Sequence, residues 1–70
     1  MPSFNPELVS LMRTVLEDVM LQVPSSVSNS TTKVFLAESI LKAASRGHTS
    51  YNELFAAATE QIQTIVSILS

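Results

Sequence analysis

The chain has 70 residues, a net charge of −2, 14% charged residues and no cysteine. The lack of cysteine excludes disulfides and thiolate metal sites, and a single histidine leaves no histidine cluster, so we expect neither a metal nor a cofactor. A lone core of this size is marginal, and short proteins commonly gain stability from a second subunit. Because a typical domain has about 25% charged residues, the low charge also favours self-association. We therefore expect a homo-oligomer, most simply a homodimer.

Nucleic acids and membranes are not expected as partners. The four basic residues, Arg13, Lys33, Lys42 and Arg46, are spread along the chain and predict no basic face. No segment reaches the roughly 18 apolar residues that span a bilayer. Residues 1–6 lack the positive charge of a signal peptide, so we expect a cytoplasmic protein. The chain resembles short bacterial proteins of unknown function, and this resemblance implies no activity.

The first predicted helix covers residues 6–22. Asn5 is a suitable N-cap, Pro6 suits the first helical position, and Glu7 lies near the positive end of the helix dipole. Pro24 cannot continue the helix. Apolar residues recur with a period near 3.6 at Leu8, Leu11, Met12, Val15, Leu16, Val19 and Val23, with Val9 and Met20 beside them.

The second predicted helix covers about residues 31–45 and follows a serine-rich loop at 24–30. Ser30 or Thr31 would cap it. Glu38 precedes Lys42 by four residues, an order that suits a surface ion pair and marks the solvent face. The expected buried positions are Val34, Ala37, Ile40, Leu41 and Ala44, with Phe35 and Leu36 beside them.

A tight joint separates the second helix from the third, which covers about residues 51–69. Gly47 is the only glycine and follows an apolar-periodic segment, as expected for the left-handed residue after a helix. Ser50 and Glu53 have the spacing of a capping box. The apolar stripe of the third helix is Leu54, Phe55, Ala58, Ile62, Ile65, Val66 and Leu69.

These elements predict an all-α fold: one domain over residues 1–70, built as a small up-down-up bundle of three helices and completed by self-association. The first and third helices both have broad apolar stripes, and one three-helix core cannot cover both fully. The excess is expected at an interface between copies. The residues predicted there are Leu8, Met12, Val15, Val19, Ile62, Ile65, Val66 and Leu69.

One short motif suggests a different function. Glu38-Ser39-Ile40-Leu41 resembles the Asp-Ser-Leu motif of acyl carrier proteins, which are also small, acidic and helical. The resemblance covers four residues and implies that Ser39 would accept a phosphopantetheine arm. Glu stands here in place of the family's Asp, no glycine precedes it, and Ser39 falls inside a predicted helix.

The remaining polar residues do not predict an enzyme. His48 is the one side chain that titrates near neutral pH, and it follows a helix end, where a solvent-exposed turn residue is expected. General-base catalysis would also need a nucleophile, a pocket and an orienting partner. A helix-turn-helix regulator ranks third, because the third helix begins without Lys or Arg. The leading interpretation is a non-enzymatic protein–protein interaction module, with the Ser39 carrier as the alternative.

Overall fold

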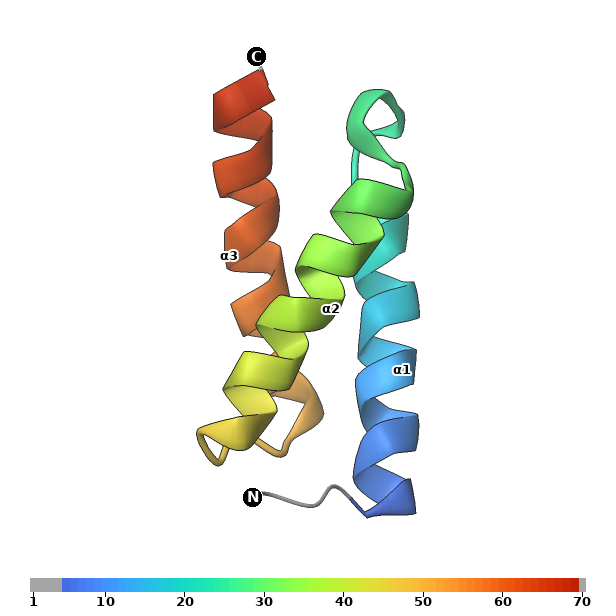
Figure 1. Cartoon of the computed structure of the whole chain (residues 1–70), viewed down its shortest axis with the longest axis vertical. Coiled ribbons are helices and arrows are strands. Elements are labelled where there is room, and N and C mark those ends of the chain that lie inside the picture. The colour runs from blue at the N-terminus through green and yellow to red at the C-terminus, as the bar shows by residue number, and fades with distance from the viewer. Residues whose placement is uncertain (1–4, 70) are drawn as a thin grey trace.

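The computed structural model describes residues 5–69, in which three α-helices pack against one another and no strand occurs. α1 spans Pro6–Gln22, α2 spans Ser30–Ser45 and α3 spans Tyr51–Leu69. Figure 1 shows α1 and α3 running in one direction and α2 returning obliquely in front of them, so the order is up-down-up. The predicted all-α fold and three-helix bundle are confirmed. No helix in the described range is long and apolar enough to cross a membrane.

α1 begins and ends where local chemistry requires. The Asn5 side-chain oxygen accepts a hydrogen bond of 2.7 Å from the Leu8 amide, which satisfies one amide that has no partner within the helix. Pro6 occupies the first turn, where its missing N–H is not needed. At the other end Val23 is extended, as expected for a residue before proline.

The connection between α1 and α2 contains a short 3-10 turn, η1, at Ser25–Val27. The cap of α2 is Asn29, not Ser30 or Thr31 as predicted, because the Asn29 side chain accepts the Thr32 amide at 2.9 Å. α2 therefore begins one residue early, at Ser30. The buried Thr32 hydroxyl donates to the Val27 carbonyl at 2.6 Å and ties the loop to the helix.

The joint between α2 and α3 ends one helix and starts the next within five residues. Gly47 has φ +100°, and its amide bonds the Ala44 carbonyl at 3.1 Å, while the His48 amide bonds the Ala43 carbonyl at 3.0 Å. These two bonds form a Schellman motif, in which a left-handed glycine satisfies the last carbonyls of the helix. The Glu53 amide then donates to the Ser50 hydroxyl at 3.3 Å, which opens α3.

The core is built from all three helices. Its largest fully buried side chains are Leu36, Ile40, Leu54, Val15 and Val19. Two residues of α2 that were predicted to be buried, Val34 and Leu41, are instead exposed. α2 is apolar on several sides, so its period does not fix the inward face. Contact with α1 and α3 together places Leu36 and Ala43 in the core instead.

Candidate functional site

Much of the apolar surface predicted to form an interface is used inside the monomer. Val15 and Val19 are fully buried, so their assignment to an interface is corrected: they belong to the core of a single copy. Leu69 lies in α3, but its side chain is outside the described residues. The other five are half-buried and pack against the core: Leu8, Met12, Ile62, Ile65 and Val66.

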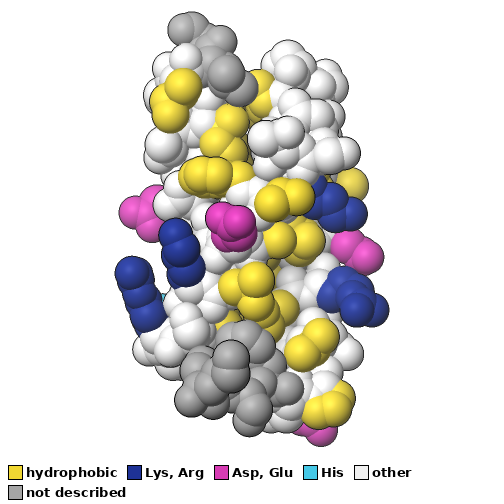
Figure 2. Space-filling model, viewed as in Figure 1, with side chains coloured by type: hydrophobic (Ala, Val, Ile, Leu, Met, Phe, Trp, Pro, Cys, Tyr) yellow, Lys and Arg dark blue, Asp and Glu magenta, His cyan; other side chains and the backbone are white. Residues whose placement is uncertain are grey.

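Exposed apolar side chains remain, and several lie on α1 and α2. Leu21 of α1 is 81% exposed and Val34 of α2 is 58% exposed, with Val9 and Leu41 each more than two-fifths exposed. Figure 2 shows hydrophobic side chains in a broken band down the face on which α2 lies, with most charged side chains at mid-height. Large exposed apolar side chains therefore occur on all three helices of the described range, with two on α1, three on α2 (including Phe35) and two on α3 (Tyr51 and Ile68).

A shallow apolar groove of about 170 Å³ runs between α1 and α2. Arg13 is the one charged residue in its lining. Val9 and Leu41 form part of the lining from opposite helices, and both are exposed. The whole lining is Val9, Met12, Arg13, Leu16, Ala37, Ile40 and Leu41. A groove with this lining suits an apolar side chain.

Four exposed residues form a row along α1, which we call the α1 row: Val9 and Arg13, which line this groove, followed by Glu17 and Leu21. Each is four positions from the next, and residues at this spacing form one ridge on a helix surface. Neither Arg13 nor Glu17 forms an ion pair within the described residues. The i, i+4 spacing of the α1 row is visible in the sequence, but the buried stripe alone does not predict it.

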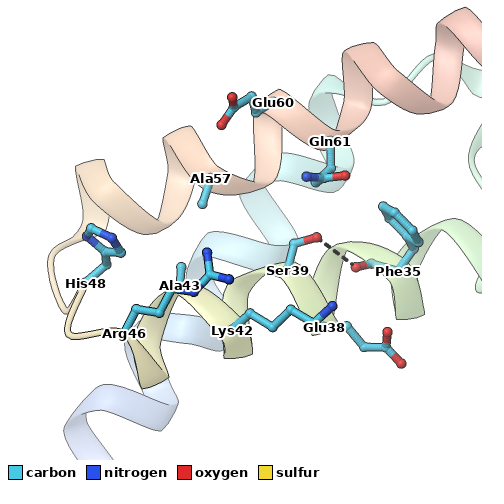
Figure 3. Close-up of a pocket in the computed structure, with 10 residues that line it drawn as sticks. All are labelled: Phe35, Glu38, Ser39, Lys42, Ala43, Arg46, His48, Ala57, Glu60 and Gln61. Atoms are coloured by element: carbon cyan, nitrogen blue, oxygen red, sulfur yellow. Dashed lines mark hydrogen bonds between the residues drawn. The ribbon is translucent and has the colours of Figure 1, made fainter.

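A second groove, of about 310 Å³, lies between α2 and α3 and is polar (Figure 3). Lys42 and Arg46 line it together with Glu38 and Glu60, so two cations are balanced by two carboxylates. Figure 3 shows Ser39 and Gln61 turned toward each other across the groove. This balance of charge gives no preference for an anion or a cation. The complete lining is Phe35, Glu38, Ser39, Lys42, Ala43, Arg46, His48, Ala57, Glu60 and Gln61.

Ser39 is half-buried in the middle of α2, and its hydroxyl donates to the Phe35 carbonyl one turn earlier, at 3.2 Å. In acyl carrier proteins, whose motif Glu38-Ser39-Ile40-Leu41 resembles, the modified serine lies at the start of a helix. The position of Ser39 therefore adds no support to the carrier alternative.

The titratable groups at the joint form an exposed cluster. His48 Nδ1 lies 2.8 Å from one Glu53 oxygen, and the Ser50 hydroxyl donates to the other at 2.8 Å. The hydrogen bond from His48, followed by that from Ser50, lowers the pKa of Glu53. The Ser50 hydroxyl also accepts a hydrogen bond from the Glu53 amide, which is one half of the predicted capping box. The Glu53 carboxylate bonds the Ser50 hydroxyl and the His48 imidazole. The cluster stabilises the start of α3.

A second polar contact joins α3 to α1. The Tyr51 hydroxyl donates to Asp18 at 2.6 Å, and the Tyr51 ring stacks on Phe55 with centroids 5.6 Å apart. The hydrogen bond to Asp18 raises the pKa of Tyr51, because ionisation would remove the donated proton and place a second negative charge beside the carboxylate. The hydrogen bond between Tyr51 and Asp18 holds the start of α3 against α1.

Within the described residues, no group of three or more His, Cys, Asp or Glu side chains could hold a metal ion. Comparison of the chain with protein families, curated proteins and solved structures gives no match.

Proposed function

We propose that the protein is a non-enzymatic interaction module that acts as a homodimer. The observation that carries this proposal is the apolar groove between α1 and α2, together with the exposed side chains around it. Val9 and Leu41 in the lining, and Val34 three positions before the lining residue Ala37 on α2, expose apolar area that the core of one copy leaves uncovered. Exposed apolar area gathered around a groove is typical of a surface that binds a protein partner.

The size of the protein agrees with this proposal. The accessible surface of the single chain is 4778 Å². A stable protein–protein interface buries about 800 Å² on each partner, roughly one sixth of that surface. Two adjacent helices, of 17 and 16 residues, present a face of suitable length for this. Burying it would also supply the apolar contacts that a 70-residue chain without disulfides lacks.

Sedimentation equilibrium over a wide range of protein concentrations tests the proposal. We expect a species of twice the 7.6 kDa chain mass that dissociates on dilution. Leu41→Ser, in the groove, should weaken this association. Ile68→Ser removes an exposed apolar side chain from the end of α3, outside the α1–α2 groove, and serves as the matched control. It should leave association unchanged. A single-chain mass at every concentration would overturn the proposal.

A further inference from the structure

Resting on the proposed homodimer, we infer that the second copy crosses α1 antiparallel to α1 about a two-fold axis. Arg13 of each copy then lies opposite Glu17 of the other. The pattern of the α1 row specifies this arrangement, because Val9, Arg13, Glu17 and Leu21 read as apolar, positive, negative, apolar at equal spacing. All four side chains are exposed, so they are available to a partner.

A row with this pattern is complementary to itself only when it is reversed. Pairing about the midpoint of the α1 row places Arg13 against Glu17 and Val9 against Leu21, and symmetry makes each of these contacts twice. Parallel pairing in register would instead place Arg13 against Arg13 and Glu17 against Glu17, and like charges so placed oppose association. The charges therefore select the antiparallel orientation.

The geometry of helix packing is compatible with this pairing. Residues spaced by four form ridges inclined to the helix axis, and two such ridges lie alongside each other when the helices cross at about 50°. Leu21 of the second copy then lies beside Val9, which lines the apolar groove between α1 and α2. Leu21 is 81% exposed in the single chain and would lose much of that exposure beside the groove.

The same pattern favours a second copy over an unrelated partner. A partner helix with only acidic side chains would attract Arg13 and repel Glu17, and one with only basic side chains would do the reverse. Neither residue has an ion-pair partner within the described part of the chain, so both charges are free to pair across an interface. α1 itself presents both partners at the required separation of four residues.

Two charge-reversal variants test the pairing by sedimentation equilibrium at low ionic strength, where exposed charges are least screened. Arg13→Glu sets two carboxylates against each other in every facing pair, and Glu17→Arg sets two guanidinium groups against each other. We expect each variant alone to raise the dissociation constant of the dimer about tenfold or more, since each replaces two attractive pairs by two repulsive ones. An equimolar mixture of the two should restore dimers, because every facing pair is then of opposite sign.

Arg46→Glu is the matched control, since it makes the same change in net charge as Arg13→Glu at an exposed cation of the α2–α3 groove. It should leave the dissociation constant within about threefold of the original value, a difference under 1 kcal/mol. Circular dichroism should show all the variants folded. If the original protein dimerises and the single variants match it, or if the mixture fails to associate, the antiparallel pairing is wrong and the homodimer stands. If the original protein is monomeric throughout, the proposed homodimer itself fails.

Discussion

Replacing Gly47 by alanine tests how the joint between α2 and α3 is built. Gly47 has φ +100°, a conformation that residues with a side chain rarely adopt. A Cβ atom placed on Gly47 would meet no heavy atom within 4 Å beyond Gly47 itself and its two neighbours in the chain. Any loss of stability in Gly47→Ala would therefore report backbone strain and not a steric clash with the rest of the protein.

The expected loss follows from two opposing effects. Holding an L-residue in the left-handed region costs about 1–2 kcal/mol. Alanine also lowers the conformational entropy of the unfolded chain, which stabilises the folded state by about 0.4–1 kcal/mol. The net loss in the free energy of unfolding is about 1 kcal/mol, which would lower the Tm of a domain of this size by about 4–8 °C.

Urea unfolding followed by circular dichroism, at one fixed protein concentration, measures this loss. Gly47→Asn provides the control, because asparagine tolerates the left-handed region better than alanine and should lose less stability. A Gly47→Ala variant as stable as the original protein would refute the left-handed cap, as would an asparagine variant that loses more than the alanine variant.

Three further predictions concern the core and the cap of α3. Thr32→Val should lower the free energy of unfolding by about 1–3 kcal/mol in urea unfolding, because the Val27 carbonyl is left without its buried hydroxyl donor; an unchanged midpoint would contradict this. Leu36→Ala should lower it by about 2–5 kcal/mol, since Leu36 is fully buried; a smaller loss would show that the core collapses around the gap. The lowered pKa of Glu53 means that the unfolded chain takes up this proton first as pH falls through about 4.5, the ordinary value. Stability from the contact with His48 should therefore be present at neutral pH and lost in acid, and Glu53→Gln should flatten that decline in pH-dependent urea unfolding.

The helices could be predicted from the sequence because their ends are encoded locally. Asn5 and Pro6 start α1, and Gly47 ends α2 through short-range backbone bonds that need no tertiary contact. The start of α2 was misplaced by one residue, because Asn29, Ser30 and Thr31 are all acceptable caps and local chemistry alone does not choose among them.

The orientation of α2 could not be predicted in the same way. Val34 and Leu41 follow a helical period as well as Leu36 and Ala43 do, and only the simultaneous packing of α2 on α1 and α3 decides which of them is buried. For the same reason Val15 and Val19 were predicted at an interface although they fill the core. Hydrophobicity marks a residue for burial, and tertiary packing determines whether its own chain or a partner buries it.

The dependence of unfolding on protein concentration tests most directly whether self-association completes this fold. If the folded form is the homodimer, each tenfold rise in protein concentration should stabilise it by about 1.4 kcal/mol per mole of dimer, and the urea midpoint should rise accordingly. A urea midpoint that stays constant across the whole concentration range would show that one copy is sufficient, and would contradict the homodimer.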